Sequence, residues 1–247
     1  MRDGGRNIIK ISFALKLTLS LSRRTITVVE SFNIVEEYMG TNPEMDALRK
    51  ARTKQKIIET AFHVFAEGTI DAVNLTKIAK TAGLNMTTVY AYFSSKELLV
   101  MAVSSWAWDQ YIRNYYSVEW PGGTAAKMFE FYMDGYIDLY RNHRDLLRFN
   151  QFFNVYVQRE CVTKETIQPF IGVVDALAER FHVIYEQGMQ DGTIRTDVPE
   201  KEIFSATLHL MLAAVTRYAV GLVYDVGVDP ERELELQKKM LMREYTV

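Results

Sequence analysis

Residues 74–97 read NLTKIAKTAGLNMTTVYAYFSSKE, and this stretch decides the fold of the region around it. Asn74 is a residue type that caps helix N-termini, so a short helix is expected to begin just after it. Gly83 then provides the left-handed backbone conformation that a tight turn between two helices needs. The small side chain of Ala79 lets the two helices cross closely, and Val89 is placed to press the second helix back against the first. The stretch therefore predicts a helix-turn-helix.

The flanking sequence predicts a helix on each side of this pair. On the N-terminal side, four apolar residues recur at helical spacing and are followed by Gly68 as a C-cap: Ile58, Ala61, Phe62 and Phe65. On the C-terminal side, Ser94 and Glu97 have the spacing of a capping box, which predicts a long helix through about Tyr116. A three-helix domain spanning residues 45–97 is therefore expected.

Charge is distributed unevenly along the chain. Residues 49–96 hold eight Lys or Arg against three Asp or Glu, a balance of +5, whereas residues 97–247 hold fifteen against twenty-two, a balance of -7. A small basic segment joined to an acidic remainder is typical of a nucleic-acid-binding head on a body that does not touch DNA.

The second helix of a helix-turn-helix lies in the major groove, with its first residues nearest the base edges. In this chain that helix is expected at about Asn85 to Tyr92, so those positions are Met86 and Thr87, and Ala91 lies on the same side about one turn later. Methionine and alanine contact thymine methyl groups, and threonine can do so or hydrogen-bond a base. We therefore expect these three residues to face the bases.

Residues 98–247 read as further helices with no convincing strand, expected at about 124–142, 144–159, 165–190, 199–225 and 230–243. The fold class is therefore all-α: an N-terminal three-helix helix-turn-helix DNA-binding domain followed by a helical domain over 98–247. Residues 1–44 are interpreted as a poorly ordered N-terminal extension, which would arise if the start codon had been assigned too early, and we expect it to be dispensable for folding.

The remaining composition argues against several classes of site and location. Cys161 is the sole cysteine and the four histidines lack metal-ligand spacing, so neither a disulfide nor a metal site is expected. No paired carboxylates or oriented nucleophile suggest an enzyme or a cofactor. The apolar run 8–21 is interrupted by lysines and is too short to span a bilayer. We expect a cytoplasmic protein.

The chain resembles the TetR/AcrR family of bacterial transcriptional regulators from Arg52 to Lys96. The resemblance is carried by the first helix with Gly68, by IAKTAGL at 78–84 and by TVYAYFSSKEL at 88–98. It implies that Thr88, Tyr90, Tyr92 and Lys96 grip phosphates. Lysine in the first turn of a helix also opposes the helix dipole, so an anion beside Lys96 is expected. Thr76, at the start of the preceding helix, is a further phosphate candidate.

The body contains fifteen aromatic residues between Trp106 and Tyr156. They could line a cavity for an apolar or aromatic molecule, although filling a core is the commoner role for any single ring. The resemblance implies that residues 98–247 are a helical ligand-binding and dimerisation domain with an effector pocket. The expected wall of this pocket is Tyr132, Tyr136, Phe152 and Tyr156, with Arg148 or His182 orienting a polar group.

The resemblance also implies a homodimer, in which the helices at 165–190 and 199–225 pair with their symmetry mates and two heads read a palindromic double-stranded operator. The favoured function is a ligand-responsive transcriptional regulator, a repressor released by a small molecule. One alternative is a regulator with a filled body, controlled by a protein partner or acting as an activator. A remote alternative is an all-α enzyme or small-molecule carrier.

Overall fold

The computed structural model describes residues 43–116, 122–160, 163–223, 227 and 229–247. The chain divides into two units, Met1–Ala51 and Arg52–Val247. In the first unit only residues 43–51 are described, and they form the opening turns of a helix. The extension expected over residues 1–44 therefore lies outside the described residues, except that Pro43 and Glu44 already belong to this helix.

The helices of the N-terminal region are α3 (Pro43–Ala66), the short 3-10 helix η1 (Ile70–Ala72), α4 (Leu75–Ala82) and α5 (Met86–Tyr92). From Arg52 onward they form the head, residues 52–95. Its core contains Phe65, Ile78 and Val89, none of which is exposed. Sequence periodicity did not predict η1, which occupies the connection between the first helix and the helix-turn-helix.

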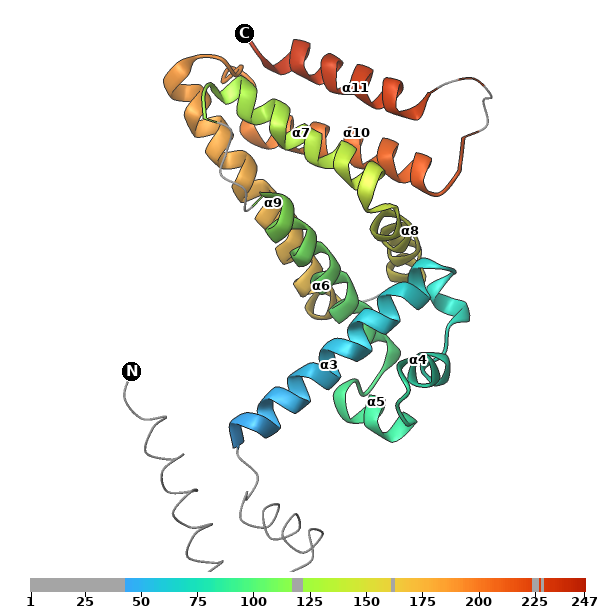
Figure 1. Ribbon diagram of the computed structural model, residues 1–247. Helices are drawn as coiled ribbons and strands as arrows, with labels where there is room; N and C mark the ends of the chain where they lie inside the picture. The colour runs from blue at the N-terminus through green and yellow to red at the C-terminus, as the bar shows by residue number, and fades with distance from the viewer. Residues whose placement is uncertain (1–42, 117–121, 161–162, 224–226, 228) are drawn as a thin grey trace, which may run out of the picture. The chain divides into compact units, whose positions relative to one another are not determined.

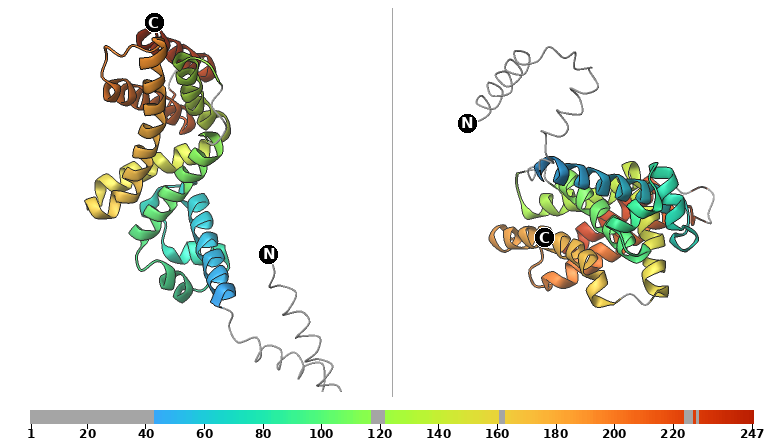
Figure 2. Two further views of the ribbon diagram at one scale, coloured as in Figure 1. Left: turned by 90° about the vertical axis from the view of Figure 1, so that its left-hand side faces the viewer. Right: turned by 90° about the horizontal axis from the view of Figure 1, so that it is seen from below.

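The body consists of α6 (Lys96–Tyr116), α7 (Ala125–Asn142), α8 (Arg144–Arg159), α9 (Lys164–Asp191), α10 (Glu200–Ala219) and α11 (Pro230–Tyr245). Figure 1 shows α6 running from the head alongside α9, while α7, α10 and α11 lie side by side. The views in Figure 2 agree with this arrangement. The described residues contain one isolated β-bridge, between Ile194 and Thr246, and no other strand pairing. The all-α fold class is confirmed.

Two expected helix boundaries were wrong. The helix expected through residue 225 ends at Ala219, because Gly221 takes a left-handed conformation (φ 76°) and its N–H donates to the Tyr218 carbonyl. The helix cap expected at Ser94 is at Ser95, where Leu98 stands in place of the Glu of a capping box. Ser95 Oγ accepts the N–H of Leu98 at 3.2 Å, and α6 begins at Lys96.

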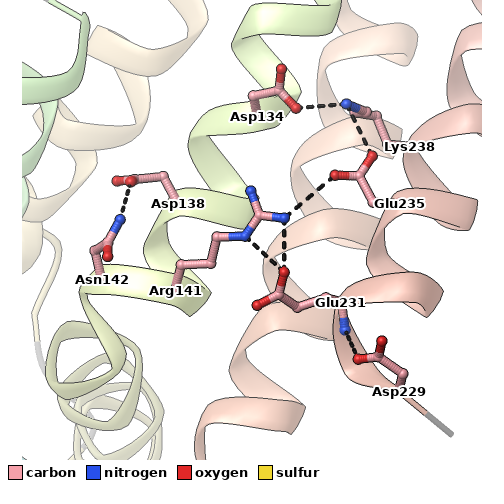
Figure 3. A network of polar contacts seen from close by, with 8 residues as sticks. All are labelled: Asp134, Asp138, Arg141, Asn142, Asp229, Glu231, Glu235 and Lys238. Atoms are coloured by element: carbon pink, nitrogen blue, oxygen red, sulfur yellow. Dashed lines mark hydrogen bonds and ion pairs between the residues drawn. The ribbon is translucent and has the colours of Figure 1, made fainter.

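An ionic network joins α11 to α7 (Figure 3). Lys238 Nζ lies 2.7 Å from Asp134, 3.1 Å from Glu235 and 3.6 Å from Glu130, and the Lys238 side chain is only 10% exposed. Arg141 of α7 binds Glu231 of α11 at 2.9 Å. Although burial of the ammonium opposes it, hydrogen bonds to the carboxylates raise the pKa of Lys238. The C-terminal helix is thus fixed to the body by charge as well as by its apolar face.

Candidate nucleic-acid interface

The turn between α4 and α5 has the geometry that the sequence predicted. Gly83 is left-handed (φ 64°), which a residue with a β-carbon rarely adopts, and Leu84 N–H donates to the Ala79 carbonyl at 2.9 Å. Ala79 is 2% exposed and Val89 is fully buried, so both lie inside the head. A second helix is therefore held at a defined angle to the first.

Each helix of the pair begins at an asparagine. Asn74 Oδ1 accepts the N–H of Lys77 at 2.9 Å, and Asn85 Oδ1 accepts the N–H of Thr88 at 2.7 Å. Each bond satisfies one of the backbone donors that helix N-termini leave unpaired. Asn74 had been expected as a cap. Asn85 had been expected as the first residue of its helix, but its backbone is extended and α5 starts at Met86.

The three residues expected to face bases are not equally exposed. Thr87 and Ala91 are exposed on the outer face of α5. Met86 is half-buried and packs against the core of the head, so only part of its side chain can reach a base edge. The structure thus leaves Thr87 and Ala91 as the more available pair.

The five residues expected to contact phosphates also differ in their surroundings. Thr76 is exposed, and Tyr90 is 52% exposed. Tyr92 is half-buried and packs against the core. The Thr88 hydroxyl is already engaged, donating to Asn85 Oδ1 at 2.8 Å.

Lys96 is engaged within the protein. Its Nζ donates to the backbone carbonyl of Asp71 in η1 at 3.1 Å, and it lies 5.9 Å from the centroid of the Tyr156 ring in α8. Partial burial lowers the pKa of Lys96, while the carboxylates of Asp71 and Glu160 oppose that shift. In place of the anion expected beside this lysine, the ammonium therefore has a hydrogen-bond acceptor within the protein, the Asp71 carbonyl.

Other cations of the head reach solvent. The exposed ones are Arg52, Lys54, Lys56, Lys77 and Lys80. Lys77 and Lys80 lie on α4, where only Thr76 had been predicted to contact a phosphate. Their signal was the local excess of positive charge, which does not indicate individual contacts.

The body encloses two of the expected ligand residues in a chain of tyrosines. Tyr136 hydroxyl donates to the Tyr132 hydroxyl at 3.3 Å, and Tyr132 donates to the Leu177 carbonyl at 3.3 Å. Tyr116 of α6 donates to the Tyr132 carbonyl at 2.9 Å. Desolvation raises the pKa of all three phenols, so they are neutral hydrogen-bonding groups. Tyr116, Tyr132 and Tyr136 thus form a hydrogen-bonded layer inside the helical core, the tyrosine layer.

The other expected ligand residues are not gathered around that pair. Phe152 lines a cleft of about 370 Å³ between η1 and α8, and Tyr156 lies beside Lys96, where burial raises its pKa to about 12. Arg148 is exposed, and its Nε donates to the Ala219 carbonyl at the end of α10, 3.1 Å away. His182 is exposed between Glu200 (3.1 Å) and Glu186 (3.4 Å).

Arg148 and His182 therefore make polar contacts of their own at the surface, and a ligand-orienting role for either stays a prediction. Arg148 binds the carbonyl end of α10, a position that suits a cation. Helical spacing placed His182 on the same element as buried residues but did not indicate which face it occupies.

Among the described residues, no group of three His, Cys, Asp or Glu side chains could hold a metal ion. None of the described helices is both long and apolar enough to cross a membrane.

Part of the chain is similar to one family of known proteins. Residues 57–103 match the family model described as "Bacterial regulatory proteins, tetR family". No curated protein matches the chain in sequence. Among solved structures, a TetR family transcription regulator from Marinobacter aquaeolei VT8 is 22% identical, with a TM-score of 0.58 over 81% of this chain and 98% of that one.

Two further solved structures are named with a small molecule or a class of small molecules. FadR from Bacillus subtilis in complex with stearoyl-CoA is 19% identical, with a TM-score of 0.61 over 76% of this chain and 97% of that one. The ketosteroid transcriptional regulator KstR2 of Mycobacterium tuberculosis is 15% identical, with a TM-score of 0.58 over 78% and 95%. At these identities the likeness shows the fold, which is that of TetR-family transcriptional regulators.

Proposed function

We propose that this chain, a TetR-family regulator by its N-terminal domain and its fold, binds operator DNA as a homodimer and releases it when a small apolar or aromatic molecule binds the body. The observation that carries the proposal is the α4–α5 pair. Its turn and both caps are built to present the outer face of α5, and that face exposes Thr87, Tyr90 and Ala91.

Residues of α5 and its neighbours have separate roles in this proposal. Thr87 and Ala91, with the accessible part of Met86, contact base edges in the major groove. Thr76, Tyr90 and Tyr92 position the head on phosphates, and Thr88 joins them when its hydroxyl proton turns from Asn85 Oδ1 to a phosphate oxygen. The exposed lysines of α4 add the electrostatic attraction that all sequences share. No catalytic residue, metal or cofactor belongs to this function, and it operates in the cytoplasm.

A test of DNA recognition is selection from a random-sequence duplex pool followed by fluorescence anisotropy. Wild-type protein is expected to enrich a palindrome. Thr87→Ala should change the preferred base at one position in each half-site, whereas Tyr90→Phe should weaken binding to all duplexes alike. A wild-type protein that enriches no sequence would contradict the proposal.

Dimerisation is proposed to use α10 and α11 of two copies. These two helices pack against each other, and their outer faces expose Leu210 (42%), Leu236 (55%) and Met240 (57%). The outer face of α9 also exposes apolar side chains, Val183 (43%) and Met189 (60%). It carries Asp175, Glu179 and Glu186 as well, which would repel their copies across a two-fold axis. We therefore favour α11 over α9 as the partner of α10. Leu236→Glu combined with Met240→Glu should yield a monomer in size-exclusion chromatography with light scattering.

Effector binding is proposed inside the body, along α6 between Ser104 and the tyrosine layer. Ser104 of α6 is fully buried and its hydroxyl has no hydrogen-bond partner among the described residues, so a ligand atom could satisfy it. Trp108, one turn along, donates to Asn150 at 3.3 Å. The acyl chain of stearoyl-CoA bound by FadR and the ketosteroid class named for KstR2 are both apolar.

A melting panel tests this assignment. Stearoyl-CoA, free stearate and a 3-ketosteroid are added to the protein, and a ligand of the folded body should raise the melting temperature and lower operator affinity. Ser104→Val should remove the response to a compound that bonds the hydroxyl. A panel without any response would favour the filled-body alternative, in which a protein partner controls the regulator.

A further inference from the structure

Asp71 is held from two sides. Its carboxylate accepts Arg159 Nη1, from the last turn of α8, at 2.8 Å. Its backbone carbonyl accepts Lys96 Nζ, from the first turn of α6, at 3.1 Å. Two helices of the body therefore meet the head at one residue of η1.

The position of Asp71 in the chain gives this contact leverage over the reading helices. Val73 separates η1 from Asn74, the N-cap of α4; Val73 is buried, and its N–H donates to the Ile70 carbonyl at 3.2 Å. Fixing Asp71 thus fixes the start of α4. Because α4 holds α5 through the Gly83 turn, the orientation of the base-facing surface follows.

A second connection between head and body is apolar. The rings of Phe62 and Phe65 in α3 lie 5.7 Å and 6.4 Å from that of Phe149 in α8. By itself, one patch of aromatic contacts allows rotation about the patch. Between η1 and α8 the head and the body are less closely packed. A cleft of about 370 Å³ lies there, lined by Thr69–Ala72 and by the α8 residues Phe152, Val155 and Arg159. The polar contacts of Asp71 cross that region.

We propose that Asp71 is a positioning residue, which Arg159 and Lys96 hold so that the helix-turn-helix keeps a set orientation on the body. The inference rests on the proposed function and adds to it the point where the body controls the head. In a dimer, two heads with set orientations match two successive major grooves. When the Asp71–Arg159 pair is broken, each head rotates more freely, and binding both half-sites at once becomes less favourable. A single head on a single half-site needs no such match.

The test compares two duplexes for each variant. One is the palindrome that wild-type protein selects from a random pool, and the other has one arm scrambled. Arg159→Gln and Asp71→Asn should each weaken binding to the palindrome by about threefold to tenfold, a range set by the modest strength of solvent-accessible ion pairs counted over two heads. Binding to the half-site duplex should not change. The double variant should lose no more than either single variant, because both remove the same contact.

Arg159→Lys should restore most of the palindrome affinity because it keeps a cation. Arg113→Gln is the matched control: it breaks the 2.9 Å pair with Asp109 within α6 and should leave both affinities unchanged. Equal losses on both duplexes would show a local role in DNA contact and overturn the inference, as would palindrome affinity at the wild-type level. If the wild-type protein selects no duplex, the proposed function itself fails and the inference falls with it.

Discussion

Gly135 of α7 lies so close to Tyr116 of α6 that a β-carbon at position 135 would be 2.9 Å from Cζ of the Tyr116 ring. The Tyr116 hydroxyl donates to the Tyr132 carbonyl at 2.9 Å, and Tyr111 hydroxyl donates to the Gly135 carbonyl itself. The absence of a side chain at this position therefore lets α6 and α7 approach and brings the tyrosine layer together.

Gly135→Ala is expected to destabilise the protein. In an unconstrained helix the change would stabilise by about 1 kcal/mol, but here the new methyl group displaces a fully packed ring. We expect a net loss of about 1–3 kcal/mol in the free energy of unfolding, measured by urea denaturation. Gly172→Ala in α9 is the control, because nothing lies within 4 Å of its added β-carbon. It should stabilise slightly, and equal effects of the two changes would contradict the packing argument.

Asn85→Ala should weaken DNA binding without touching a DNA-facing side chain. It removes the acceptor for both the N–H and the hydroxyl of Thr88, so the first turn of α5 loses its cap. The expected cost is about 1 kcal/mol in the free energy of unfolding. Asn85→Asp keeps the acceptor and should retain stability. Operator affinity of the Ala variant should fall with the base preference unchanged; a changed preference would place Asn85 at the bases.

The sequence was sufficient for features that depend on neighbours along the chain. The Gly83 turn, the Asn74 cap and the buried Val89 follow from backbone conformation and helical spacing, which act over a few residues. The boundary at Asn85 was missed by one residue, since asparagine is compatible with both a cap and a first turn.

Contacts between residues far apart in the sequence could not be predicted from the sequence alone. Asp71 and Arg159 are 88 positions apart, and neither belongs to a motif. The partners of Arg148 and His182 could not be predicted for the same reason: spacing shows that a residue is helical, but the tertiary contacts decide whether it faces Ala219, Glu200 or the core.

Lys238→Met should destabilise the α7–α11 contact. The change leaves Asp134, Glu235 and Glu130 close together without their shared cation. Because these carboxylates are 35–52% exposed, water screens their repulsion, and the expected loss in the free energy of unfolding is about 1–3 kcal/mol rather than that of a fully buried pair. Lys239→Met, at an exposed site on the same helix, should have little effect. The difference between the two should shrink in 1 M salt, and its persistence there would argue against an ionic origin.

Lys96→Met tests whether this lysine binds a phosphate or serves the head–body contact. In the structure its ammonium is directed to the Asp71 carbonyl, so we expect palindrome affinity to fall while the dependence of affinity on salt concentration keeps its slope. A lysine on a phosphate would instead reduce the slope by about one for each head. Anisotropy titrations at several salt concentrations measure both quantities, and a flatter slope would return Lys96 to the phosphate contacts.

Asp191 is expected to make the free energy of unfolding depend on pH in the acidic range. Desolvation opposes ionisation, but hydrogen bonds from Ala125 N–H, the Thr193 hydroxyl and N–H, and Gln187 lower its pKa from 3.8 to about 2. A group with a lowered folded-state pKa contributes stability that is fully present above its unfolded pKa and is lost as pH falls toward the folded one. Asp191→Asn should therefore lower the urea midpoint at pH 7, and its difference from wild type should shrink between about pH 4 and pH 2. Asp175→Asn, exposed on the same helix, is the control. A pH-independent difference would mean that the loss reflects the shape of the loop between α9 and α10 rather than the charge of this carboxylate.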